Sequence, residues 1–240
     1  MKKFFRQIII LILRIQAKIY LKKYKPQLIL VCGQIFRTNV KDELVQALKD
    51  AKISARGSFK GYNSEIGIPL SILNQKAGFT SILKWFKLII SGFKAINDPS
   101  PAKMLVLEIV VDNAKEMNNL LKLIKPDILI FTDFDQSFAQ KDLNLAYENL
   151  VNSMAGEGTL LINNDYKVFE NLGGNRDKKI FTFGKSEKAN IRAIDIKELG
   201  NGQQLVYLFK NSQEKMTLPR FGDSALYSAL INKFILSLKI

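Results

Sequence analysis

A strand-like apolar run that ends in a glycine, a basic residue and a hydroxyl residue is the segment of this chain best suited to binding a phosphate. Residues 28–41 read LILVCGQIFRTNVK. In a phosphate-binding loop, consecutive backbone N–H groups curl around the anion, a basic side chain reaches it, and a Ser or Thr hydroxyl binds Mg²⁺. Gly33, Arg37 and Thr38 fit this pattern, but Phe36 occupies the position of a required second glycine. The segment therefore predicts either a nucleotide site or a loop in which Phe36 packs into the core and no phosphate is cradled.

Three acidic residues stand where they could complete a magnesium site beside that loop. Glu108 lies near the end of the apolar run LVLEI, and Asp133 and Asp135 follow the run DILIF. Ligand-binding loops gather at the carboxyl ends of parallel strands. Because the chain contains no histidine, a bound metal would be a hard, oxygen-liganded ion such as Mg²⁺. A carboxylate paired with a lysine, and a solvated acidic turn, would explain the same residues without a metal.

The composition is that of a globular chain with an excess of positive charge. Its 240 residues are 47% apolar and 24% charged, enough for one α/β domain with a substantial core. The net charge of +14 favours an anionic partner, which could be a nucleotide, a nucleic acid or the cytoplasmic face of a membrane. The single cysteine, Cys32, allows no disulfide framework and indicates a reducing compartment.

The first 26 residues, MKKFFRQIIILILRIQAKIYLKKYKP, predict a basic amphipathic helix at residues 1–26. The apolar run at residues 8–13 is much shorter than the ~20 residues that cross a bilayer. Because seven lysines and arginines occur by residue 23, residues 1–25 could lie on an anionic membrane surface. The alternative is a helix that packs on the domain formed by residues 27–240.

From residue 27 onward, strand-like and helix-like segments alternate. This pattern predicts an α/β fold with a mainly parallel sheet and helices on both faces. After residue 178, short period-2 segments with a glycine-containing turn predict a small antiparallel β meander. The expected parallel strands are 28–32, 103–109, 127–131 and 159–162, two of the expected helices are 40–51 and 224–238, and the expected meander comprises IFTF, NIRAIDIKEL, QQLVYLF and EKMTLP.

Seven segments follow one another along the chain: VCGQIFRTNVKDEL, GYNSEIGIPLSIL, LVLEI, KPDILIFTDF, LINNDYKVFENL, FTFGKSEKANIRA and LPRFGDSALYSAL. Together they resemble the Mur ligases, ATP-dependent amide-forming enzymes of peptidoglycan synthesis, and in particular the central domain of the D-alanyl-D-alanine-adding type. The resemblance runs from residue 25 to the C-terminus, and GYNSEIGIPLSIL is its most distinctive part. It implies ATP and Mg²⁺ as cofactors, and a reaction in which ATP phosphorylates a carboxylate that an amine then attacks.

The resemblance also implies a set of site residues. Arg37 stands where the family has a lysine, and its planar guanidinium is a poor mimic of a compact ammonium. Asn63 and Glu65 match the family's asparagine-rich segment. The candidate nucleotide-binding residues are Gly33, Arg37, Thr38, Lys41, Asn163 and Asp165, and the candidate Mg²⁺ ligands are Thr38, Glu108, Asp133 and Asp135.

Several departures from the family pattern fall on the catalytic parts. In TDFDQSF, Asp133 replaces an asparagine and Phe138 replaces a metal-binding histidine. Tyr147 stands near the position of a carbamylated lysine, and Ser224 and Ser228 replace a histidine and the asparagine that reads adenine. With only about 26 residues before the first strand and none for a further domain at the end, we expect neither of the family's flanking domains.

These departures favour a catalytically degenerate Mur-ligase-like domain that acts as a cytoplasmic binding or scaffold protein in cell-wall synthesis. Its expected partners are an active Mur-type ligase, other cell-wall proteins or the inner face of the plasma membrane. The alternative is a diverged ATP-dependent carboxylate-amine ligase or nucleotide hydrolase with a rebuilt Mg-ATP site. Nucleic-acid binding has no motif beyond charge and ranks last. We expect Trp85, Phe86 and Phe93 to belong to the core or to a docking face.

Overall fold

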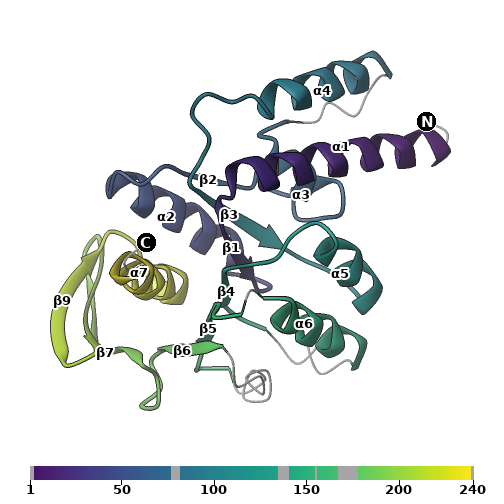
Figure 1. Cartoon of the computed structure of the whole chain (residues 1–240). Coiled ribbons are helices and arrows are strands. Elements are labelled where there is room, and N and C mark those ends of the chain that lie inside the picture. Colours follow the sequence, from purple (N-terminus) through teal and green to yellow (C-terminus); the bar gives the residue numbers. More distant parts are fainter. Residues whose placement is uncertain (1–2, 77–81, 135–140, 155, 167–177, 239–240) are drawn as a thin grey trace.

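A nine-stranded sheet forms the centre of the computed structural model, which describes residues 3–76, 82–134, 141–154, 156–166 and 178–238 (Figure 1). The strand order is β2-β3-β1-β4-β5-β6-β7-β8-β9. Neighbouring strands from β2 to β7 run parallel, whereas β7, β8 and β9 pair in antiparallel fashion. The strands are β1 (Gln27–Cys32), β2 (Ala55–Gly57), β3 (Met104–Ile109), β4 (Ile128–Phe131), β5 (Thr159–Asn163), β6 (Lys179–Gly184), β7 (Ile191–Leu199), β8 (Gly202–Phe209) and β9 (Ser212–Leu218).

Helices cover both faces of the parallel part of the sheet, because successive strand residues point to opposite sides. In β1, Leu28 and Leu30 enter one core and Ile29 and Val31 enter the other. The mainly parallel α/β fold with an added antiparallel meander is thereby confirmed. The first core is closed by α1 (Lys3–Tyr24), α3 (Gly67–Ile72), α4 (Ile82–Ala95), α5 (Ala114–Leu121) and α6 (Lys141–Ser153), and the second by α2 (Arg37–Asp50) and α7 (Gly222–Ser237).

The segment IFTF does not belong to the antiparallel meander, and that part of the sequence prediction is wrong. It lies within β6, which pairs in parallel with β5 on one side and with β7 on the other. The reversal of direction begins one strand later, between β7 and β8. Period-2 alternation identifies a strand but not the direction of its neighbour, so the sequence pattern could not separate these cases. The three-residue edge strand β2 was also absent from the prediction.

The N-terminal helix α1 is built into the first core along one of its sides. Ile9, Leu13, Ala17 and Tyr20, spaced by three or four residues, are fully or almost fully buried. The helix contacts α3 and α4. The inner side of α1 therefore packs on the domain, which is one of the two alternatives for residues 1–26. The division of the chain into residues 1–26 and residues 27–240 stays a prediction. No helix in the described ranges has both the length and the apolar character needed to cross a membrane.

Trp85, Phe86 and Phe93 do not share one environment. Trp85 is buried, with 3% of its surface exposed, whereas Phe86 and Phe93 are each 55% exposed. Adjacent residues on a helix are about 100° apart around the axis, so Trp85 and Phe86 cannot occupy the same face. Trp85 thus belongs to the core, and the two phenylalanines belong to the outer surface of α4.

The strand order places a crevice at the carboxyl end of β1. The chain passes from β1 through α2 to the edge of the sheet, returns to β3 beside β1, and then crosses to β4 on the other side of β1. Such a change of direction opens a crevice outside the carboxyl ends of the strands, where ligands of open α/β sheets bind. The loop after β1, Glu108 on β3 and Asp133 after β4 all lie at this edge.

Candidate functional site

The loop between β1 and α2 curls its backbone N–H groups around the carboxylate of Asp133. The N–H groups of Gln34 and Ile35 donate to Oδ2 at 3.2 and 2.7 Å, and that of Phe36 donates to Oδ1 at 2.9 Å. Asp133 is 2% exposed. Three consecutive N–H groups at the start of a helix form an anion-binding nest, and the positive end of the helix dipole adds to it. The nest is therefore present, and its anion is a side chain of the same protein.

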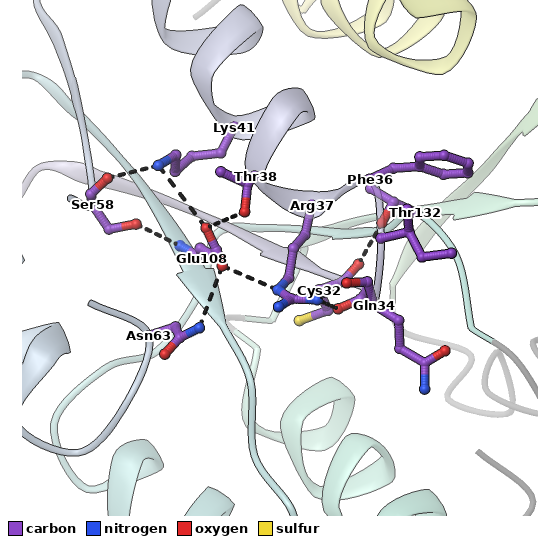
Figure 2. Close-up of polar contacts among 12 residues, drawn as sticks. Cys32, Gln34, Phe36, Arg37, Thr38, Lys41, Ser58, Asn63, Glu108 and Thr132 are labelled. Atoms are coloured by element: carbon purple, nitrogen blue, oxygen red, sulfur yellow. Dashed lines mark hydrogen bonds and ion pairs between the residues drawn. The ribbon is translucent and has the colours of Figure 1, made fainter. Parts of the chain in front are cut away.

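Neighbouring buried residues hold the Asp133 carboxylate in that position. The Thr132 hydroxyl donates to Asp133 Oδ1 at 2.7 Å. It also lies 3.0 Å from the carbonyl oxygen of Cys32 (Figure 2). Asn163 at the end of β5 donates from Nδ2 to the carbonyl oxygen of Thr132 at 2.7 Å. Burial raises the pKa of the Cys32 thiol, which stays neutral. Residues at the carboxyl ends of β4 and β5 thus hold the Asp133 carboxylate against the loop.

A second carboxylate, Glu108 on β3, gathers the polar side chains on the other side of the loop (Figure 2). Its Oε1 accepts from Arg37 Nε at 3.0 Å and from Asn63 Nδ2 at 3.3 Å. Its Oε2 accepts from the Thr38 hydroxyl at 3.0 Å and lies 4.0 Å from Lys41 Nζ. Glu108 is 2% exposed, so its charge depends on these partners rather than on water.

Lys41 points away from the loop and into the protein. Only 1% of it is exposed, and its Nζ donates to the carbonyl oxygen of Ser58 at 2.8 Å and pairs with Asp42 Oδ1 at 3.0 Å. The Ser58 hydroxyl in turn accepts from the backbone N–H of Glu108 at 3.1 Å. Lys41 therefore ties α2 to the end of β2 and neutralises Glu108.

Arg37 is also turned inward, toward its own loop. Besides its bond to Glu108, its Nη1 donates to the carbonyl oxygen of Gly33 at 2.7 Å and to that of Gln34. Only 21% of the Arg37 side chain is exposed. These bonds use the Nε donor and both Nη1 donors, three of the five N–H groups of the guanidinium, and hold the side chain against its own loop.

Phe36 packs its ring against the second core, as one of the two sequence interpretations requires. The ring meets that of Tyr227 on α7 edge to face, with centroids 5.6 Å apart. The loop curls around the carboxylate of Asp133. The backbone N–H of Phe36 donates to Asp133 Oδ1 at 2.9 Å, while its ring packs against the second core and points away from Glu108 (Figure 2).

Asp165 organises a different part of the edge. Its carboxylate accepts from the backbone N–H groups of Lys185 and Ser186 at 2.8 to 2.9 Å and from the Tyr227 hydroxyl at 2.9 Å. Its own N–H donates to Asn163 Oδ1 at 3.0 Å. Asn163 and Asp165 thus join β5, the turn after β6, and α7. Both oxygens of Asp165 already accept hydrogen bonds.

We expect Tyr227→Phe to lower the free energy of unfolding by about 1 kcal/mol, the usual net value of one hydrogen bond. Burial and the bond to Asp165 raise the pKa of Tyr227. Since its pKa in the folded protein lies above that in the unfolded chain, about 10, this contribution is complete below that pH and is lost as the pH rises. Urea titrations at neutral and alkaline pH should show the difference between the two proteins shrinking. A constant difference would contradict this assignment.

We expect Gly33→Ala to lower the free energy of unfolding by about 2 kcal/mol, a usual value for a group added in a packed site. A Cβ atom at Gly33 would lie 2.0 Å from Thr132 Oγ1 and 2.7 Å from Asp133 Oδ1. Both atoms are fixed by the hydrogen bonds that close the loop. Thermal unfolding measures the change, and Gly156→Ala is the matched control, because nothing lies within 4 Å of a Cβ built there. Equal melting temperatures for the two variants would contradict the close approach.

The arrangement does not fit a nucleotide phosphate in the loop. A phosphate there would need the three N–H groups that Asp133 holds, and it would meet the negative charge of that carboxylate. The Thr38 hydroxyl, the expected Mg²⁺ ligand, donates to Glu108. No group of three or more acidic, cysteine or histidine side chains suited to a metal occurs within the described residues. A pocket of about 270 Å³ opens beside the loop, between Arg37, Phe134 and Tyr147.

The structure brings most of the predicted site residues together, although their mutual bonds leave few free groups. Gly33, Arg37, Thr38, Lys41, Glu108 and Asp133 form two adjoining clusters, and Asn163 is joined to them through Thr132. Asp165 lies in the neighbouring cluster around α7, and its N–H donates to Asn163 Oδ1. Asp135 and Phe138 lie outside the described residues. Tyr147 is buried at the wall of the pocket, and burial raises its pKa. The Ser224 hydroxyl accepts from Asn39 Nδ2 at 3.0 Å, and buried Ser228 donates to the Ser224 carbonyl.

Sequence reasoning missed two residues of the site, Ser58 and Thr132. Both are buried polar residues that follow a strand of the sheet. Thr132 stands directly after the apolar run DILIF, so its position could have indicated a role at the strand end. Ser58 follows β2, which is too short to produce a readable pattern.

The family model described as the Mur ligase middle domain matches residues 93–232. Among solved structures, the fold is similar to that of MurF from Acinetobacter baumannii, with a TM-score of 0.71 and 14% identity over 95% of this chain and 46% of that one. MurF ligase from Thermotoga maritima in complex with ADP gives a TM-score of 0.72 and 17% identity over 95% and 48%. A murein peptide ligase from Psychrobacter arcticus gives a TM-score of 0.61 and 12% identity, over 93% of this chain and 47% of that one. The chain thus spans about half the length of these structures.

Proposed function

Because this chain belongs to the Mur ligase family, with which it shares the middle domain, we propose that it is a non-catalytic member that acts as a binding or scaffold protein in peptidoglycan synthesis. The observation that carries the proposal is the carboxylate of Asp133 within the loop, where it accepts three consecutive backbone N–H groups. These are the donors that a nucleotide phosphate would require.

The charges around the loop support the same proposal. ATP is strongly anionic and would have to displace a buried carboxylate while bringing its own negative charge beside Glu108. The cations that could compensate are engaged, Arg37 by Glu108 and loop carbonyls, and Lys41 by Asp42, the Ser58 carbonyl and Glu108. The protein would thus keep the family's fold while the carboxylate of Asp133 occupies the position of the phosphate.

The family's role supports the class of partner that we propose. A middle domain that no longer turns over ATP could still bind an active Mur-type ligase or another cell-wall protein in the cytoplasm. The +14 net charge also suits an anionic partner, although it does not select one.

The proposal is tested by release of inorganic phosphate from Mg-ATP by the full chain, with D-alanyl-D-alanine and a carboxylate acceptor of the peptidoglycan precursor class. We expect a rate equal to that of Arg37→Ala. A rate that exceeds the variant's and depends on the acceptor would overturn the proposal.

A second candidate function, a diverged ligase or nucleotide hydrolase, is favoured by one observation. Thr38 and Glu108, the expected Mg²⁺ ligands, contact each other directly at the start of α2. If Asp133 left the loop, the two oxygens could face a metal together with the nucleotide. In that case Thr38→Val, which replaces the hydroxyl with a methyl group of similar size, would abolish phosphate release, whereas the proposed non-catalytic role predicts no release to abolish.

A further inference from the structure

The outer face of α1 carries a row of exposed apolar side chains. Ile8, Leu11, Ile15 and Ile19 are 40%, 58%, 51% and 43% exposed, and their spacing of three or four residues places them on one face. They lie opposite the buried residues that join α1 to the core. A helix that packs on a domain usually presents polar residues to water. The composition of this outer face is therefore unusual for a surface helix.

The outer face of α4 repeats the pattern. Phe86, Ile90 and Phe93, at positions i, i+4 and i+7, are 55%, 59% and 55% exposed. The opposite side of the helix enters the core through Trp85 and Leu88. Each helix is thus apolar on both its inner and its outer face.

The two helices lie next to each other at one end of the molecule (Figure 1). Gln16 on α1 donates from Nε2 to the carbonyl oxygen of Ile89 on α4 at 2.8 Å. A Cβ at Gly92 would lie 2.3 Å from Gln16 Oε1, so the absence of a side chain there allows the close approach. The two apolar rows therefore belong to one fixed helix pair, here called the α1/α4 surface and defined by the seven exposed apolar residues of these helices.

The charge of this helix pair is entirely positive. Helix α1 contains six lysines and arginines, α4 contains three lysines, and neither helix contains an aspartate or glutamate. Lys18, Lys22, Lys87 and Lys94 are exposed beside the apolar rows. All 22 acidic residues of the chain lie elsewhere. A second copy that docked through the same surface would bring like charges together, whereas an anionic surface would complement them.

We propose that the α1/α4 surface binds the interface of an anionic lipid bilayer. Exposed isoleucine, leucine and phenylalanine side chains would enter the boundary between headgroups and acyl chains, and the lysines beside them would contact lipid phosphates. The helices would lie in the plane of the interface while their inner faces stay packed in the first core. This inference does not depend on whether the loop binds a nucleotide.

Co-sedimentation of the full chain with vesicles tests the proposal. We expect binding to equal parts of phosphatidylglycerol and phosphatidylcholine, weaker binding as salt rises, and no binding to phosphatidylcholine alone. Phe86→Ser with Phe93→Ser, and separately Lys87→Glu with Lys94→Glu, should each weaken binding about tenfold. Point variants are preferable to deletion of residues 1–25, since deletion would remove buried residues of α1.

The matched control is Leu199→Ser with Phe221→Ser, which removes apolar groups that are 38% and 51% exposed outside these helices. We expect this control to bind vesicles as the wild type does, with thermal unfolding confirming that all variants are folded. Absence of vesicle binding, equal binding to both kinds of vesicle, or equal loss in the control and the α4 variant would each overturn the proposal. So would a concentration-dependent dimer, measured by sedimentation, that the phenylalanine variant abolishes while vesicle binding is absent.

Discussion

Replacement of Glu108 by alanine is expected to lower the free energy of unfolding by about 3–5 kcal/mol, the usual cost of removing one partner of a buried ion pair. Glu108 accepts hydrogen bonds from Arg37, Thr38 and Asn63, and it lies 4.0 Å from buried Lys41. Without the Glu108 carboxylate, buried Lys41 keeps the Ser58 carbonyl and the exposed carboxylate of Asp42, and it loses its buried negative charge. At a few degrees per kcal/mol, the melting temperature should fall by about 10 °C or more.

A comparison of three variants tests whether the loss of stability comes from the burial of Glu108. Glu108→Gln keeps the shape and an acceptor oxygen, and should cost less than Glu108→Ala while remaining folded. Glu157→Ala is the control, because the Glu157 side chain is 86% exposed and pairs with Lys179 at 2.9 Å in a region where screening makes such pairs weak. If Glu108→Ala and Glu157→Ala had equal melting temperatures, the buried cluster would not have the role described.

Asp133→Ala is expected to lower the free energy of unfolding by about 3 kcal/mol, because three loop N–H groups lose a buried acceptor, each bond being worth about 1 kcal/mol. Asp133→Asn retains one acceptor oxygen, so its free energy of unfolding should lie between those of Asp133→Ala and the wild type. Denaturant titration measures both changes. Asp127→Ala is the comparison, since within the described residues the Asp127 carboxylate accepts one backbone N–H, that of Leu28, at 2.7 Å. A cost for Asp133→Ala no larger than for Asp127→Ala would contradict closure of the loop by Asp133.

Much of the fold could be predicted because its signals are local. Continuous apolar runs of four to six residues that alternate with helical patterns indicate parallel strands, and β1, β3, β4 and β5 appear where these runs lie. The direction of β6 depends on which strand it meets, and its sequence carries no trace of that choice. The sequence does not decide what the inner face of α1 contacts, because a basic amphipathic helix can place its apolar side on lipid or on protein.

The site was predictable in membership but not in arrangement. Glycine, threonine and carboxylate positions indicated which residues would gather at the edge of the sheet. Asp133 enters the loop because the ends of β1 and β4, which are far apart in the chain, lie close together in the sheet. Sequence spacing does not indicate that distance. The same holds for Arg37, whose guanidinium turns to loop carbonyls of Gly33 and Gln34 rather than outward.

Calorimetric titration of the full chain with Mg-ATP tests the central claim most directly. The full chain is required because α1 contributes buried residues to the core. We predict no heat of binding at millimolar nucleotide, since Asp133 fills the loop and the cations are engaged. Micromolar binding that Arg37→Ala and Thr38→Val abolish, in variants whose melting shows them to be folded, would contradict the claim and establish a working nucleotide site.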